Sequence, residues 1–263
     1  MPDLKSIQDT YLQLWTSREA RQTALSAGGD LDERGVRLYA SLIEIGRLDL
    51  MRSIYPCIEA LLGKKFKDLV LSYYECMPAD HYNLNKSARR FSQYLQEHEP
   101  KLLERHPFIV ELADFEWVEL EVMEAAVDAQ SAQISEPDLD DALAFASARP
   151  ILADVVYLRR YHYPVMAISK KLLDGEKLPR RVKKEETFIA IYRDMHNHEC
   201  RFLELGELSF EVLAKLKENP ETNYGELIKY AVQQCSDGAE ETVQEFLNLI
   251  NELKEAELII GDT

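Results

Sequence analysis

The sequence predicts a mainly α protein of the α+β class, with an N-terminal helical bundle followed by a C-terminal winged-helix-like domain that contains a small β-sheet. Three observations predict this class. Apolar residues recur at helical spacing through residues 1–146. After Pro150 the chain carries short β-branched, apolar runs, which favour strands. Three more amphipathic helical patterns then follow. We therefore expect one domain over residues 1–146 and a second over residues 147–263.

In the first half, the pattern predicts a succession of helices with short connections. Pro56 suits a first helical turn, and Gly63 suits a left-handed helix end. The apolar pattern over residues 108–128 predicts the longest helix of the chain, with a solvated acidic face on its other side. Helices are expected over residues 3–17, 31–52, 58–62, the stretch from Phe66 to Tyr73, the stretch around Phe91, 108–128 and 139–146.

The second half predicts the order strand, connector, strand, strand and three helices. The strands are expected over residues 151–158, 187–192 and 199–205, and the helices over residues 207–218, 224–235 and 239–257. Between Arg159 and Lys184 lie nine Lys or Arg residues and two acids. This basic connector is either a solvated linker or a site for an acidic peptide or partner.

Composition narrows the class of protein. The net charge is −16, which disfavours non-specific nucleic-acid binding. The four cysteines are scattered with no Cys-x-x-Cys pair, so we expect reduced thiols. No apolar run reaches the roughly 18 residues that cross a bilayer, and the N-terminus lacks a signal core. We therefore expect a cytoplasmic protein with no membrane association.

The sequence offers little sign of metal or catalytic chemistry. A di-iron bundle adds a Glu three residues before a His, and none of the six histidines has one. His196 and His198, with His162 as a third ligand, could form a zinc or copper site, although a polar turn is favoured. Serine-nucleophile and glycine-rich phosphate motifs are absent from the sequence. We expect no enzyme activity and no cofactor in this chain.

The last helical pattern separates two uses of a winged helix. A DNA-binding unit would place this helix in the major groove. Residues 239–257 carry six glutamates and one basic residue, Lys254. Such a helix would repel phosphates and has no arginine to recognise guanine. A DNA-binding transcriptional regulator therefore stays only as the alternative.

Peptide binding is compatible with the same charge. An open sheet edge can accept an extended peptide as an added strand. The strand over residues 199–205 and the apolar residues of the last helix could form the groove, although the same apolar residues could instead form the core. The predicted peptide-binding residues are Glu199, Cys200, Arg201, Phe202, Leu203, Phe246 and Ile250.

Two stretches then point to known families. Arg34 with Tyr39, Ile54-Tyr-Pro-Cys-Ile-Glu-Ala-Leu-Leu-Gly63 and Leu112-Ala-Asp-Phe-Glu-Trp117 occur in an order that resembles the bacterial HvfC/BufC/MbnC-like family, labelled a DNA-binding domain. Its members include partner subunits of multinuclear non-haem iron oxidative enzymes, for example in methanobactin biosynthesis. Residues 199–260 resemble the recognition element that captures leader peptides during maturation of ribosomally made peptides.

The resemblance implies a function for each half. The helical half would dock on a TIM-barrel non-haem iron enzyme, with Tyr55, Pro56, Glu116 and Trp117 as the docking residues. The winged half would hold a precursor peptide by strand addition, and the iron would belong to the partner. The expected protein is thus a non-catalytic accessory subunit that presents a precursor peptide for modification. The acidic winged unit and the long connector depart from the family pattern.

Overall fold

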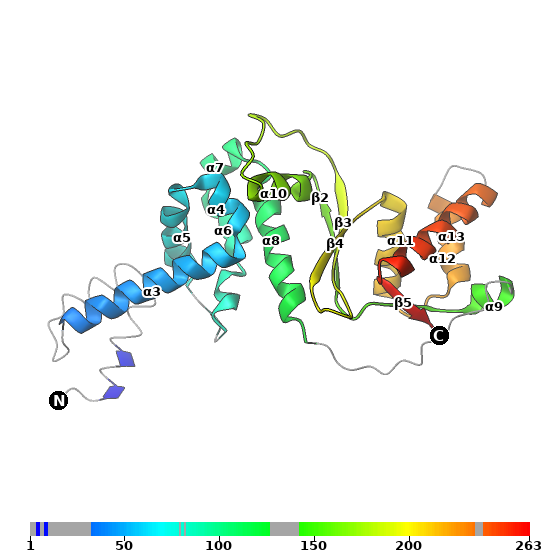
Figure 1. The fold of residues 1–263 in the computed structure, drawn as a ribbon, viewed down its shortest axis with the longest axis horizontal. Coiled ribbons are helices and arrows are strands. Elements are labelled where there is room, and N and C mark those ends of the chain that lie inside the picture. The colour runs from blue at the N-terminus through cyan, green and yellow to red at the C-terminus, as the bar shows by residue number, and fades with distance from the viewer. Residues whose placement is uncertain are drawn as a thin grey trace. The chain divides into compact units, whose positions relative to one another are not determined.

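The structure is a computed structural model that describes residues 4–5, 8–9, 33–78, 80–81, 83–126, 142–234 and 239–263. Most of the helix expected over residues 3–17 lies outside the described residues. The chain divides into two compact units (Figure 1). Unit 1 comprises Met1–Trp117 and Tyr163–Lys184, and unit 2 comprises Val118–His162 and Glu185–Thr263. The expected class, mainly α with small antiparallel sheets, is confirmed.

The units differ from the ranges 1–146 and 147–263 expected from the sequence. The first change of unit falls inside helix α8 (Ile109–Glu124), and a part of the basic connector belongs to the helical unit. That part contains a helix, α10 (Val165–Leu173), whose buried residues are Val165, Ile168 and Leu172. Because α10 packs on α4 (Pro56–Leu62), the expected connector is not a simple linker.

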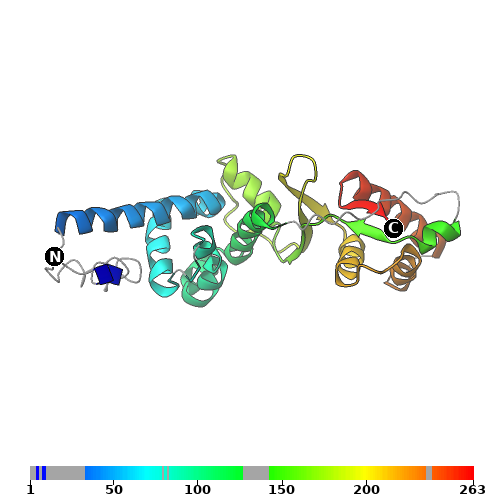
Figure 2. The ribbon, with the colours of Figure 1, turned by 90° about the horizontal axis from the view of Figure 1, so that it is seen from below.

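The helices expected over residues 31–52, 58–62, Phe66 to Tyr73, around Phe91 and 108–128 occur in the expected order (Figures 1 and 2). The helical segments Asn85–Ala88 and Pro100–Arg105 were not expected. The longest helix among the described residues is α3 (Glu33–Ile54), with 22 residues, whereas α8 has 16. The expectation that α8 would be the longest helix is therefore wrong. The other described elements of this unit are α5 (Lys65–Cys76), the 3-10 helix η1 (Asn85–Ala88), α6 (Phe91–His98) and α7 (Pro100–Arg105).

An aromatic cluster forms the centre of unit 1. The Phe91 ring lies 4.7 Å from that of Tyr55 and 5.3 Å from that of Tyr73, and all three are fully buried. Buried hydroxyl groups need hydrogen-bond partners. Tyr55 Oη donates to the Ala88 carbonyl at 2.8 Å, and Tyr73 Oη donates to the Ser87 carbonyl at 2.6 Å. The two tyrosines thereby hold η1 against the core.

Unit 2 contains two antiparallel sheets. β2 (Val156–Tyr161), β3 (Thr187–Arg193) and β4 (Cys200–Leu205) form a three-stranded sheet with β3 in the centre. β1 (Pro150–Leu152) pairs with β5 (Ile259–Asp262) in a separate sheet. The single strand expected over residues 151–158 is therefore wrong. A bend at Asp154 divides it, because Ala153 donates its N–H to the Leu258 carbonyl at 2.9 Å and β1 pairs elsewhere.

Helices α11 (Glu207–Glu218), α12 (Tyr224–Gln234) and α13 (Ala239–Glu255) lie on one face of the three-stranded sheet (Figure 1). Side chains alternate between the two faces of a strand. Phe188, Ala190 and Tyr192 of β3 accordingly point into one buried cluster with the apolar residues of these helices. α9 (Ala142–Ser147) joins this cluster through Phe145, whose ring stacks on Tyr224 at 4.4 Å. The helices thus cover the sheet but do not pair with its edges.

Among the described residues, no helix combines the length and the apolar character needed to cross a membrane.

Candidate functional site

Strand β4 forms one edge of the three-stranded sheet. Within the described residues it pairs only with β3, from Phe188 opposite Leu205 to Arg193 opposite Cys200. In an antiparallel edge strand, alternate residues direct both N–H and C=O away from the neighbouring strand. β4 can therefore present backbone donors and acceptors to an extended peptide.

The other edge, β2, is more occupied. Lys217 Nζ donates to the Val156 carbonyl, and Arg159 donates to the Leu158 carbonyl at 3.2 Å. The centre of the Tyr157 ring lies 5.2 Å from Lys217 Nζ and 5.6 Å from the Arg159 guanidinium carbon. Burial lowers the pKa of Lys217, and the charge of Arg159 lowers it further. These contacts make β4 the better candidate edge.

The predicted peptide-binding residues divide into two groups. Arg201, Phe202 and Leu203 lie in β4, and the side chains of Phe202 and Leu203 are half-buried. Leu203 packs against the core on the helix-covered side. Cys200 begins the strand, whereas Glu199 is exposed and lies just outside it. This group surrounds the open edge.

Phe246 and Ile250 form the second group and lie elsewhere. Their side chains are 0% and 2% exposed, inside the buried cluster of unit 2. A bound peptide could touch them only if the core opened. Of the two roles that the sequence left open for these residues, the structure places them in the core.

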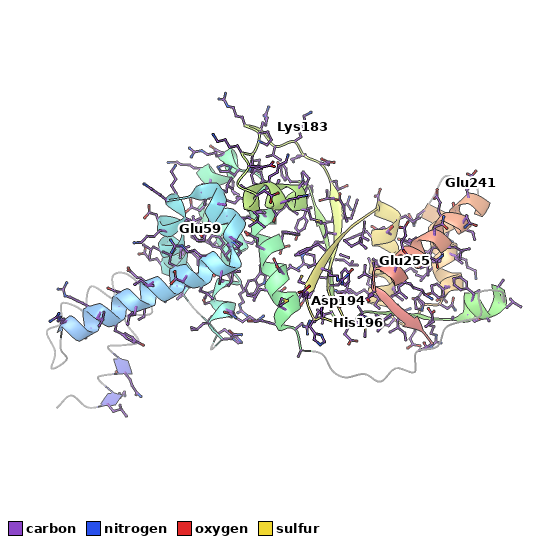
Figure 3. The ribbon with its side chains drawn as sticks, viewed as in Figure 1. Glu59, Lys183, Asp194, His196, Glu241 and Glu255 are labelled. Atoms are coloured by element: carbon purple, nitrogen blue, oxygen red, sulfur yellow. The ribbon has the colours of Figure 1, made fainter. Side chains whose placement is uncertain are left out.

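The turn before β4 is organised by a buried carboxylate that sequence reasoning missed. Asp194 is fully buried, and its Oδ1 accepts the N–H groups of His196 at 2.7 Å and Asn197 at 3.0 Å. Arg201 forms an ion pair with the other carboxylate oxygen (Figure 3 labels Asp194 and His196). The N–H groups of Asn197 and His196 lower the pKa of Asp194, and the charge of Arg201 contributes. Aspartate at the start of a polar turn was the available signal.

A lowered pKa makes the turn sensitive to acid. A carboxyl whose pKa is lower in the folded than in the unfolded state stabilises the fold above its unfolded pKa, and this contribution is lost as pH falls through the folded pKa. We expect the Asn197 amide resonance to titrate with a midpoint below about 3.9, the usual aspartate value. Nitrogen–proton correlation spectra recorded against pH measure it. Asp194→Asn should abolish the titration; a midpoint above 3.9 would contradict the assigned geometry.

The two histidines of this turn are exposed. The His196 side chain is 82% exposed, with Nε2 3.1 Å from Glu257 Oε1. His198 has a φ of 60° and is exposed. Across the described residues, no group of three or more His, Cys, Asp or Glu side chains is arranged to hold a metal ion.

The cysteine in β4 lacks the features of a reactive thiol. Burial raises the pKa of Cys200 to about 12, and the nearby charge of Glu119 adds to the shift. Since the thiolate is the reactive form, this thiol is a poor nucleophile at neutral pH.

Three of the four predicted docking residues are buried. Tyr55 lies in the aromatic cluster, and Trp117 is 6% exposed with Lys86 Nζ 5.4 Å from its ring. Glu116 is 4% exposed, and its Oε1 accepts the N–H of Cys57 at 2.6 Å. Only Pro56 of the four is exposed. The expectation of a solvated acidic face on α8 is therefore wrong at Glu116, which caps the start of α4.

Arg193 is a second structural residue that the sequence did not reveal. Its guanidinium donates to the Val122 carbonyl at 3.0 and 2.6 Å and also to the Ala125 carbonyl. These acceptors lie at the C-terminal end of α8, where helix carbonyls lack intrahelical partners. Arg193 therefore joins the end of β3 to the end of α8 within unit 2.

The comparisons with known proteins bear on unit 2. Residues 153–254 match the family model described as the HvfC C-terminal domain. The match runs from just before β2 into α13 and so includes β4. It supports the resemblance to the HvfC-like family over this region. No curated protein matches the chain.

Proposed function

We propose that the protein is a non-catalytic accessory subunit that binds a precursor peptide and presents it to a multinuclear non-haem iron enzyme. The observation that carries the proposal is the open edge of β4, with half-buried Phe202 and Leu203 beside it. Main-chain pairing along such an edge supplies affinity, and the neighbouring side chains supply specificity. The similarity of residues 153–254 to the HvfC C-terminal domain supports an accessory role in a biosynthetic system.

Presentation would act through effective concentration. A peptide held by one segment keeps its remaining residues close to the enzyme that binds the accessory subunit. The chemistry at the iron would then require little recognition of the modified segment itself. In this proposal the TIM-barrel partner supplies the iron, and this chain supplies the binding edge.

The alternative, a DNA-binding regulator, finds little support in the charges of unit 2. The last 58 residues contain four lysines, and three of these have protein partners. Lys254 Nζ lies 2.6 Å from the buried carboxylate of Asp262, and Lys215 Nζ lies 4.8 Å from the Tyr230 ring centre. Lys217 donates to Val156, as described above. Glu241 and Glu255 lie on the surface of α13 (Figure 3). Phosphate binding needs accessible cations, and the single basic residue of α13, Lys254, is paired with Asp262.

Paired proline substitutions at adjacent residues of β4 test strand addition. At one of Phe202 and Leu203 the N–H points toward β3, and at the other it points outward. Proline removes that N–H in either case. Proline at the residue whose N–H points toward β3 should lower the thermal unfolding midpoint. Proline at the residue whose N–H points outward, the outward variant, should leave the sheet paired and weaken peptide binding about tenfold or more.

The measurement requires a candidate iron enzyme and a candidate Cys-rich precursor peptide, which are sought among the neighbouring genes and expressed with the full chain. Co-purification of the enzyme measures docking, and fluorescence anisotropy of the labelled precursor measures the affinity of the peptide for β4. If the outward variant, whose proline removes the outward N–H, is folded and binds the peptide with wild-type affinity, β4 is rejected as the binding edge. Failure of the enzyme to co-purify at micromolar concentration would reject the accessory role.

A further inference from the structure

A groove in unit 1 has a charge opposite to that of the whole protein. It encloses about 1150 Å³ beside α4, α7 and α10. Its charged lining includes six Lys or Arg side chains and two acids, Glu104 and Glu176, in a chain of net charge −16. We call it the connector groove, and its six cations are Arg105, Lys177, Arg180, Arg181, Lys183 and Lys184.

Five of these cations come from one short stretch, residues 177–184, and all five are exposed. Figure 3 shows Lys183 on this stretch. None of the five has an ion pair or hydrogen bond with another described residue. Clustered like charges repel one another, so such a cluster is stabilised when an anionic partner supplies the opposite charge.

The backbone of the same stretch has no backbone partner among the residues that the structure describes. Glu176 donates its N–H to the Lys171 carbonyl at 2.8 Å, and Glu185 donates to the His162 carbonyl at 2.9 Å. Between these two anchors, residues 177–184 form neither helix nor strand and make no backbone hydrogen bond to the other described residues. Their C=O groups, and their N–H groups except at Pro179, can therefore pair with an extended chain.

The groove also offers apolar surface. Half-buried Leu61, Leu178 and Val182 line it, together with the more deeply buried Phe108 and Leu172. Its volume exceeds the range of about 300–1,000 Å³ that is usual for small-molecule sites. A ligand that uses the cations, the free backbone and the apolar floor together would be a polymer with both acidic and apolar side chains.

We propose that the connector groove binds an acidic peptide segment in which carboxylate and apolar side chains are interleaved. The carboxylates would pair with Arg180, Arg181 and Lys183, and the apolar side chains would contact Leu61 and Leu178. A nucleic acid fits less well, because it has no apolar side chains for the floor. A nucleic acid longer than the groove would also extend onto a protein surface that is acidic overall. The groove belongs to unit 1 and β4 to unit 2, so binding in the groove does not depend on strand addition at β4.

A fluorescence-anisotropy titration of the full chain tests the site. The probe is a short labelled peptide that interleaves Glu and Leu with Ser, and a second peptide carries Gln in place of Glu. Arg180→Glu with Arg181→Glu should weaken binding of the acidic peptide about tenfold or more, because two attractive contacts become repulsive. Added salt should weaken binding of the same peptide.

The matched control is Lys67→Glu with Lys229→Glu, which changes the net charge equally at exposed lysines outside the groove. It should change the affinity less than about twofold. Equal losses in the two double variants would overturn the site in favour of general attraction. Equal affinity for the Gln peptide would also overturn it, as would tighter binding of oligothymidylate that the groove variant alone loses. Circular dichroism of each variant confirms that it is folded.

Discussion

Replacing Phe246 with alanine is expected to lower the free energy of unfolding of unit 2 by about 3–5 kcal/mol, the usual loss for a buried aromatic residue. The Phe246 side chain is fully buried in the cluster that joins α11, α12 and α13 to the sheet. Removing its ring leaves a cavity that neighbouring side chains fill only in part. Urea denaturation followed by circular dichroism measures the change.

Leu247→Ala provides the matched control for this substitution. Leu247 is the next residue along α13 and is only partly buried, so its truncation should cost clearly less. A loss below about 1 kcal/mol for Phe246→Ala would place this side chain in an adaptable groove and not in a packed core. The comparison therefore decides between the two roles that its apolar character allows.

Replacing Glu116 with alanine is expected to destabilise unit 1 by about 2–3 kcal/mol, in the range for a hydrogen bond to a charged group. The carboxylate accepts the Cys57 N–H at the start of α4, where helix N–H groups have no intrahelical partner. Truncation would leave that donor buried without its acceptor. Chemical denaturation of the full chain in a Trp15→Phe background, monitored through Trp117 fluorescence, measures the effect on this unit.

Glu116→Gln is the control for this second substitution. Glutamine keeps the size of the side chain and an acceptor oxygen but removes the charge, so it should lose less stability than alanine. Equal stability of Glu116→Ala and wild type, combined with lost binding of the partner enzyme, would instead restore the docking role. A simultaneous loss of stability and docking would mean that Glu116 acts through α4.

Helical periodicity predicted most elements of the fold, but it could not assign depth. The pattern correctly places Phe246 and Ile250 on the apolar face of a helix. Whether that face lines a groove or a core depends on how closely the sheet approaches it, which no local pattern contains. Glu116 shows the same limit in reverse. It looks like one member of a solvated acidic face, yet the start of α4, distant in sequence, lies against it.

The connector contains two sequence patterns, the apolar spacing of a helix and a cluster of basic residues. Val165, Ile168 and Leu172 have the spacing of a helix face, and they are buried in α10. The nine basic residues between Arg159 and Lys184 instead indicated a solvated linker or a site for an acidic partner. The pairing of β1 with β5 could not be predicted from the sequence either, because the register of distant strands depends on tertiary packing.

The discontinuous make-up of the helical unit sets an order of events during protein synthesis. Cys57 and Ile58 of α4 are buried in a unit that also requires α10, and Cys57 Sγ lies 3.2 Å from Ser169 Oγ. At about 5–20 residues per second, the ribosome delivers α10 several seconds after α4. Throughout that interval the apolar face of α4 lacks its native cover. The nascent chain therefore passes through a stage in which binding by chaperones or aggregation competes with completion of the unit.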